Sequence, residues 1–234
     1  MILCTTCQPR APAWAARIIT VTSTAYNALL DYIDTTTERS EALRAAYAHA
    51  EEFSLPAPGV AVGQLLATLT AGGVHAEKPQ AIAITPAVSV AGLYLLEGLP
   101  EGGILSCIDP EAEHQANAKQ LFRTAGHPTS RVRFLPSRPL DVIGRLANES
   151  YHVIYADVPT MDLQALTKAA WPLLTHGGTL VLAGALLDGT LADASRTDRI
   201  TTAAREADEF ARSLEGAVIT RLPLESGITL VTKR

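Results

Sequence analysis

Five short apolar runs, spaced along residues 81–183 with helix-like segments between them, constrain the fold of this chain more than any other sequence feature. Each run is almost wholly apolar, which is typical of parallel strands that are buried on both faces of a sheet. Strands that alternate with helices through short connections predict an α/β fold, a doubly wound sheet with right-handed crossovers. The predicted strands are residues 81–85, 104–108, 132–135, 152–156 and 179–183.

Helical periodicity fills the intervals between these strands and continues on both sides of them. A helical pattern runs over residues 23–53, is interrupted by SLPAPG (54–59), and resumes over residues 60–70, with Gly72 and Gly73 as its expected C-cap. The final GAVITRLPLESGITLVTK predicts two antiparallel strands around LPLESG that complete the sheet. The helices predicted between and after the strands are residues 89–97, 111–125, 140–148, 161–174 and 197–214.

Length and composition predict one globular domain. The chain has 234 residues, of which 47% are apolar, and this is enough for a single sizeable core. We expect residues 1–20 to form a disordered tail and residues 21–234 to form one domain, with N-terminal helices (21–75) and an αβα sandwich (80–234). The uncharged run 79–96 could suggest a membrane span, but Pro86 in its middle favours a buried strand followed by a helix.

Charge and cysteine content argue against several classes of protein. The net charge is −5 with both signs interspersed, so the sequence predicts no basic surface for nucleic acid. Three cysteines cannot build a disulfide framework, and no convincing signal peptide is present, which predicts a protein of the reducing cytoplasm. Cys4 and Cys7 form a CxxC pair, but no second pair completes a zinc site, so we interpret this pair as incidental.

The turns that follow the strands are the candidate ligand site, because open sheets of this kind bind ligands at the carboxyl ends of their strands. The first turn, from Thr85 to Ser89, contains no glycine, and neither GxGxxG nor GxxxxGK[ST] occurs in the chain. A phosphate-rich cofactor such as NAD or ATP is therefore not favoured. Asp109 ends the second strand, where an acidic side chain either binds the hydroxyls of a ribose or caps the following helix.

Six features follow one another in register from about residue 55 to the end of the chain. They are PGVAVGQLLATL (58–69), GLYLLEGLPEGGILSCID (92–109), the spacing from Asp109 to Ala125-Gly126, YHVIYAD (151–157), WPLLTHGGTLVLAGALLDG (171–189) and LPLESGITLVTK (222–233). Together they resemble the catechol/caffeoyl-CoA type of O-methyltransferases, which use S-adenosylmethionine. The resemblance implies a Rossmann-like class I methyltransferase with a seven-stranded, mostly parallel sheet, a C-terminal antiparallel hairpin and helices on both faces.

The same resemblance implies which residues contact the cofactor. Asp157, which follows the fourth strand, would lie near the sulfonium and the acceptor, and it is our candidate catalytic residue. The remaining implied residues are Thr85, Pro86, Ala87 and Ser89 for the methionine portion and ribose, Asp109 and its neighbour Pro110 for the ribose hydroxyls, and Ser137, Arg138 and Pro139 for the adenine.

The metal and base positions depart from the family pattern. Ala183 and Gly184 stand where the family has a metal-binding Asp-Asn pair, and Thr160 stands where it has a lysine. Mg²⁺ prefers near-octahedral oxygen donors, and of the expected set only Asp157 remains. We therefore expect no tightly bound catalytic metal, with Asp157 as the ligand if one binds. His152, inside the fourth strand, is interpreted as buried and structural.

These expectations predict an enzyme, an S-adenosylmethionine-dependent O-methyltransferase that methylates a hydroxyl of a small, phenol-like molecule. An alternative, motivated by the departures, is a catalytically impaired homologue that acts as a ligand-binding or interaction protein. A third interpretation, a nicotinamide-dependent oxidoreductase, is disfavoured by the missing GxGxxG. The expected partners are a small-molecule acceptor and a second copy of the chain, bound through the apolar N-terminal helices, with no nucleic acid and no membrane.

Overall fold

The computed structural model describes residues 23–72 and 78–234, and the chain divides into two compact units, residues 1–38 and 39–234. The described part of the first unit is helix α1 (Ser23–Thr36) and the two residues after it. Ser40 caps a separate helix, α2 (Glu41–Glu52), by accepting the N–H of Leu43. The continuous helix predicted for residues 23–53 is therefore wrong, because this cap starts a second helix. The predictions for residues 1–20, Cys4 and Cys7 lie outside the described residues.

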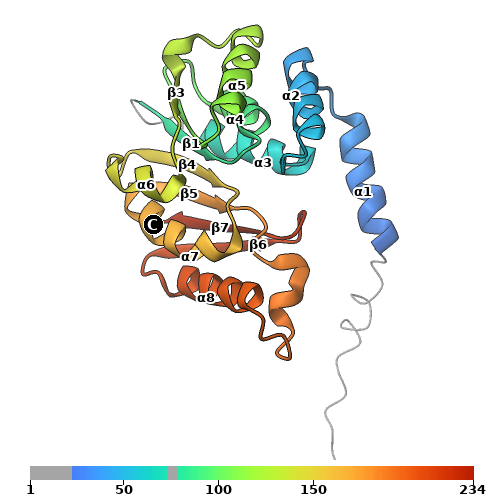
Figure 1. Cartoon of the computed structure of the whole chain (residues 1–234), viewed down its shortest axis with the longest axis vertical. Coiled ribbons are helices and arrows are strands. Elements are labelled where there is room, and N and C mark those ends of the chain that lie inside the picture. The colour runs from blue at the N-terminus through green and yellow to red at the C-terminus, as the bar shows by residue number, and fades with distance from the viewer. Residues whose placement is uncertain (1–22, 73–77) are drawn as a thin grey trace, which may run out of the picture. The chain divides into compact units, whose positions relative to one another are not determined.

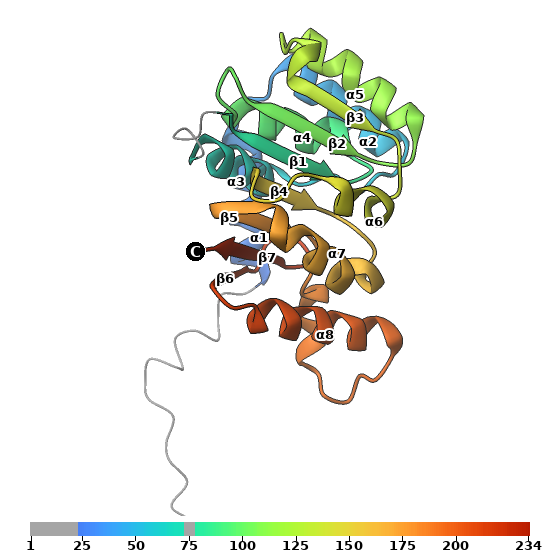
Figure 2. The same cartoon turned by 90° about the vertical axis from the view of Figure 1, so that its left-hand side faces the viewer.

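The second unit is built on a seven-stranded sheet in the order β3-β2-β1-β4-β5-β7-β6 (Figures 1 and 2). The first five strands in this order pair in parallel, and β7 is antiparallel to both of its neighbours, so six strands share one direction. The predicted mostly parallel sheet with its C-terminal hairpin is confirmed. The strands are β1 (Gln80–Ile84), β2 (Ile104–Ile108), β3 (Val132–Leu135), β4 (Tyr151–Ala156), β5 (Leu174–Leu182), β6 (Ala217–Leu222) and β7 (Ile228–Lys233).

Successive residues of β1 belong to two different hydrophobic cores, one on each face of the sheet. Ala81 and Ala83 pack in the core that includes α2 to α5, and Ile82 and Ile84 pack in the core that includes α7 and α8. Figure 1 shows α7 and α8 next to each other. The helices of this unit, besides α2, are α3 (Val60–Ala71), α4 (Val88–Gly98), α5 (Ala112–Thr124), α6 (Pro139–Val142), α7 (Leu163–Ala170) and α8 (Arg199–Ser213).

Two predicted helices were too long. The helix predicted for residues 140–148 is only α6 followed by a 3-10 turn, Ile143–Arg145. The helix predicted for residues 161–174 is α7 with a 3-10 turn on each side, and Pro172, which has no N–H to donate, lies in the second turn. Strand β5 then begins at Leu174, because a bulge containing Gly177 and Gly178 still allows Leu174 to pair with Tyr151.

Two glycines allow α3 and α4 to pack closely against each other. A β-carbon on Gly63 would collide with the ring of Tyr94, and one on Gly98 would collide with the carbonyl of Ala67. The close approach fixes α4, whose first residues follow the turn at the end of β1. None of the described helices is both long enough and apolar enough to cross a membrane.

Candidate active site

A cavity of about 560 Å³ opens where β1, β2, β3 and β4 end, at the edge of the sheet that was predicted to bind a ligand. Its walls are mainly apolar, and five carboxylate side chains border it, those of Asp109, Glu111, Asp141, Asp157 and Asp162. Seven predicted site residues line it: Thr85, Pro86, Asp109, Pro110, Arg138, Pro139 and Asp157. The lining is completed by residues that were not among the predicted site residues: Ile84, Ile108, Glu111, His114, Leu140, Asp141, Val158, Pro159, Asp162 and Leu166.

Three predicted residues do not line the cavity. Ala87 and Ser89 are buried at the start of α4, where they face the protein interior. Ser137 lies in the turn after β3, where its N–H donates to the carbonyl of Leu135 at 2.9 Å. These residues shape the turns, while their neighbours reach the cavity.

The first turn is closed by a hydroxyl in place of a glycine. The Oγ1 of Thr85 accepts the N–H of Ala87 at 3.2 Å, and the threonine is almost completely buried. Such a side-chain bond within a turn mimics a backbone turn. The turn therefore brings the chain from β1 into α4 without the backbone freedom that glycine would provide.

Asp109 is held by the first turn of α5. Its Oδ2 lies 2.7 Å from Nδ1 of His114, and the backbone N–H of Glu111 also donates to the carboxylate. The Nε2 of Gln115 donates to the carbonyl of Asp109 at 2.7 Å. The N-cap residue of α5 is Glu111, so Asp109 does not cap the helix in the way that one interpretation expected.

The carboxylate of Asp109 is nearly inaccessible to solvent, with 3% of the residue exposed. Burial raises its pKa, and the hydrogen bond from His114 acts in the opposite direction. Because an ionised carboxylate accepts only, His114 donates through Nδ1. The carboxylate of Asp109 is thus hydrogen-bonded by His114 and Glu111, and the residue borders the cavity. His114 lies in the first turn of the helix that follows Asp109. A histidine at that place, shortly after an acidic residue that ends a strand, is the sequence signal that could have identified it.

Asp157 presents a partly buried carboxylate without a hydrogen-bond partner among the described residues. Its backbone N–H donates to the carbonyl of Ile84 at 2.8 Å, which fixes the residue at the end of β4. Burial, and then the nearby charge of Glu225, raise its pKa to about 6. Such a group is ionised at neutral pH and has a proton affinity suited to a general base.

The positions expected to hold a metal are poor in oxygen donors. Ala183 and Gly184 follow β5 and carry no side-chain oxygen, and Pro159 and Thr160 provide no carboxylate. Among residues 23–72 and 78–234, no three His, Cys, Asp or Glu side chains are grouped so that they could hold a metal ion. Nδ1 of His152 accepts the N–H of Gln80 at 3.4 Å, near the opposite ends of the strands.

The fold and this cavity define a class, the α/β enzymes that bind a cofactor at the carboxyl ends of a doubly wound sheet. The model of the O-methyltransferase family matches residues 64–234. A curated protein of Mycolicibacterium smegmatis, whose name assigns it provisionally to the O-methyltransferases, is 33% identical over 204 residues, covering 86% of this chain and 94% of its own. The chain therefore belongs to the O-methyltransferase family.

Two solved structures are also similar to the chain. A crystal structure of a Corynebacterium glutamicum protein is 57% identical, with a TM-score of 0.87, and the match covers 89% of this chain and 97% of that one. The O-methyltransferase TomG of Streptomyces achromogenes, crystallised with S-adenosylmethionine, is 21% identical, with a TM-score of 0.77, and the match covers 92% and 99% of the two chains. The second likeness shows a shared fold.

Proposed function

We propose that the protein transfers the methyl group of S-adenosylmethionine to a hydroxyl of a small, phenol-like molecule. The observation that carries this proposal is the carboxylate of Asp157, which has no hydrogen-bond partner in the described chain and borders the same cavity as Asp109. A general base must lie within reach of the proton that it removes, and its pKa must suit the working pH. The pKa of Asp157, raised to about 6, meets the second condition.

The residues around the cavity fit S-adenosylmethionine. A volume of about 560 Å³ lies within the range of about 300–1,000 Å³ that is usual for small-molecule sites. We assign Asp109 to the ribose hydroxyls, Arg138 and Pro139 to the adenine, and Thr85 with its turn to the methionine portion. When bound, this cofactor supplies a methyl group on a positively charged sulfur, which an acceptor oxygen can attack.

The chain's own part in the reaction is to orient the acceptor and remove its proton. Asp157 accepts the proton of the acceptor hydroxyl, and about nine-tenths of its carboxyl groups are ionised at pH 7 if the pKa is about 6. The apolar lining that includes Ile84 and Leu166 excludes water and so strengthens the effect of each charge. Holding the reacting atoms in line supplies much of the remaining rate enhancement.

The residues present do not fit a catalytic Mg²⁺, and we route no step through one. Of the positions that the family pattern assigns to metal binding, Asp157 still carries a carboxylate, whereas Ala183 and Gly184 lack side-chain oxygens. Calorimetry should therefore detect no micromolar binding of Mg²⁺ or Ca²⁺. Micromolar binding that disappears in Asp157→Ala would overturn this part of the proposal.

The function is tested in two steps with the full-length chain. Calorimetry with S-adenosylhomocysteine should show binding that Asp109→Ala weakens at least tenfold, because it removes a charge-assisted acceptor. Tritium-labelled S-adenosylmethionine, incubated with a panel of catechols and flavonoids, should then yield labelled product that Asp157→Asn abolishes. Binding without transfer to any acceptor would favour the alternative, a catalytically impaired homologue. Absence of binding at millimolar concentration would refute the proposal.

We further propose a homodimer that functions in the cytoplasm. Large apolar side chains on α1, Leu29 and Tyr32, are more than half exposed, and such side chains commonly join protein–protein interfaces. Analytical ultracentrifugation should give twice the chain mass, and substituting both residues by serine should shift the equilibrium toward the monomer. A monomer at micromolar concentration would contradict this proposal.

A further inference from the structure

The β6–β7 hairpin contains a glutamate in a backbone conformation that favours glycine. The N–H of Gly227 donates to the carbonyl of Leu224 at 2.8 Å and closes a four-residue turn. Glu225, the first central residue of this turn, has a φ of 52°, whereas Ser226 does not have a positive φ. Glycine is preferred at such a position because a β-carbon strains the left-handed conformation. Strain of this kind persists where surrounding contacts impose it, often beside functional sites.

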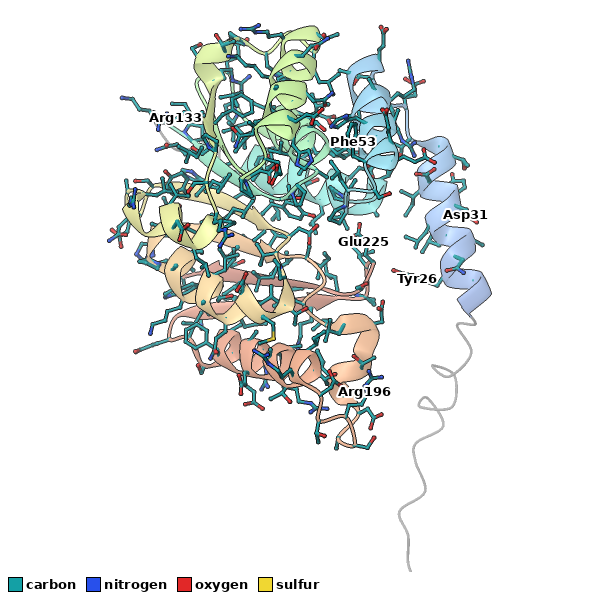
Figure 3. The ribbon with its side chains drawn as sticks, viewed as in Figure 1. Tyr26, Asp31, Phe53, Arg133, Arg196 and Glu225 are labelled. Atoms are coloured by element: carbon teal, nitrogen blue, oxygen red, sulfur yellow. The ribbon has the colours of Figure 1, made fainter. Side chains whose placement is uncertain are left out.

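The side chain of Glu225 makes the contact that accounts for its place in the turn. Its Oε1 accepts the backbone N–H of Gly59 at 2.6 Å. Gly59 is the N-cap residue of α3, and the segment before it is also held by the hydroxyl of Tyr47, which donates to the carbonyl of Pro58 at 2.8 Å. Figure 3 shows Glu225 pointing from the hairpin toward the connection between α2 and α3.

The topology places this contact at the same edge of the sheet as Asp157. Strand β6 runs in the same direction as β4, so the turn that follows β6 lies at the edge of the sheet where β4 ends. The hairpin is fixed there, because the N–H of Asp188 donates to the carbonyl of Ser226 at 3.1 Å. The glycine after it packs tightly against Leu186, where a β-carbon would collide. Along this edge, Glu225 lies on the side of Asp157 away from Asp109.

We propose that Glu225 is a positioning residue for methyl transfer: its carboxylate ties the C-terminal hairpin to the start of α3 and places a second negative charge at the edge of the sheet that carries Asp157. This inference rests on the proposed role of Asp157 as the base. It explains why the turn holds a glutamate, since only a side chain that reaches Gly59 joins two segments so distant in the sequence.

The groups that face Asp157 support an electrostatic role for Glu225. Besides burial, the charge of Glu225 raises the pKa of Asp157. Tyr155 on β4 and Tyr47 on α2 lie in the same neighbourhood, and burial together with the charges of Asp157 and Glu225 keeps the pKa of Tyr155 well above its usual value. Tyr155 is therefore neutral near pH 7 and does not offset the second charge.

Two variants of the full-length chain separate the tether from the charge. Glu225→Gln keeps an oxygen that can accept the N–H of Gly59 but removes the charge. Glu225→Gly removes both and relieves the strained backbone. Glu215→Gln is the matched control, because it removes an exposed glutamate charge at the other end of β6. Carboxyl ¹³C NMR, assigned with Asp157→Asn, measures the pKa of Asp157, and amide hydrogen exchange measures the protection of Gly59.

In Glu225→Gln, we expect the pKa of Asp157 to fall by less than about one, because burial is the larger of its two causes. Gly59 should stay protected in this variant. In Glu225→Gly, the amide of Gly59 should exchange about tenfold faster, and kcat/KM with catechol should fall about tenfold at an unchanged KM for S-adenosylmethionine. The Tm should not fall, since glycine suits the turn. The control should match the wild type throughout.

The inference would be overturned if the pKa of Asp157 is unchanged in Glu225→Gln and the amide exchange of Gly59 is unchanged in Glu225→Gly. A kcat/KM in Glu225→Gly equal to that of the wild type would do the same. Failure of the proposed function is distinguishable, because the wild type would then transfer no label to any acceptor while the NMR and exchange measurements still report on Glu225.

Discussion

Replacing Asp157 by asparagine should make the protein more stable and less active at the same time. The pKa of this carboxyl is raised from 3.8 to about 6 in the folded protein, so the fold disfavours its charged form. Below its pKa in the unfolded chain, such an acid is protonated in both states and does not change the free energy of unfolding. Above its pKa in the folded protein, it is ionised in both states, and the cost of burying its charge lowers the free energy of unfolding by the full amount. The folded state therefore loses stability as the pH rises from about 4 to about 6, and an uncharged asparagine avoids that loss.

The magnitude follows from the difference between the two pKa values. A difference of about two corresponds to at most about 3 kcal/mol of unfolding free energy above pH 6. Asp157 is partly accessible to water, which reduces this figure to about 1–2 kcal/mol. For a chain of this length, the gain corresponds to a rise in Tm of about 2–8 °C.

Thermal unfolding at pH 8 and at pH 4, at one protein concentration, checks this prediction. Asp157→Asn should raise the Tm at pH 8 and change it little at pH 4, while methyl transfer falls about a hundredfold or more because the base is lost. Asp141→Asn is the matched control, because it changes an exposed carboxylate of the same cavity and should alter stability by less than about 0.5 kcal/mol. A gain of equal size at both pH values, or no gain at pH 8, would refute the reasoning.

Three further predictions concern other parts of the structure. His114→Phe should weaken the binding of S-adenosylhomocysteine about tenfold in calorimetry, whereas His114→Asn should restore it, because the asparagine amide can donate to Asp109 and the phenyl ring cannot. Equal affinities of the two variants would contradict this prediction. Gly98→Ala should lower the free energy of unfolding in urea by about 1–3 kcal/mol through its collision with α3, whereas Gly102→Ala, with open space around it, should have little effect. The thiol of Cys107, whose pKa is raised by complete burial, should resist Ellman's reagent in the native state and react after unfolding, when the other two cysteines are replaced by serine.

The sequence predicted the central strands well because each is a short run of buried apolar residues. Strands β2 and β3 match their predicted bounds, and β1 and β4 differ from theirs by one residue. The beginning of β5 was missed because Gly177 and Gly178 are typical of a loop, and only pairing with β4 across a bulge makes the segment a strand. That pairing is a long-range contact, which local propensity does not contain.

The candidate site, like the strands, was predicted from the sequence where the signal is local. Asp109 and Asp157 were found because each directly follows an apolar strand, and the rule that ligands bind at strand ends is a local one. Glu225 was not found, because its contact depends on how the C-terminal hairpin meets α3, whereas His114, five residues after Asp109, has a local signal that was overlooked. The sequence by itself determined the strands, their order of alternation with helices and the two carboxylates. The tertiary structure alone decided that Glu225 is tied to Gly59 and that its charge acts on Asp157, because these interactions depend on distances between segments that are far apart in the chain.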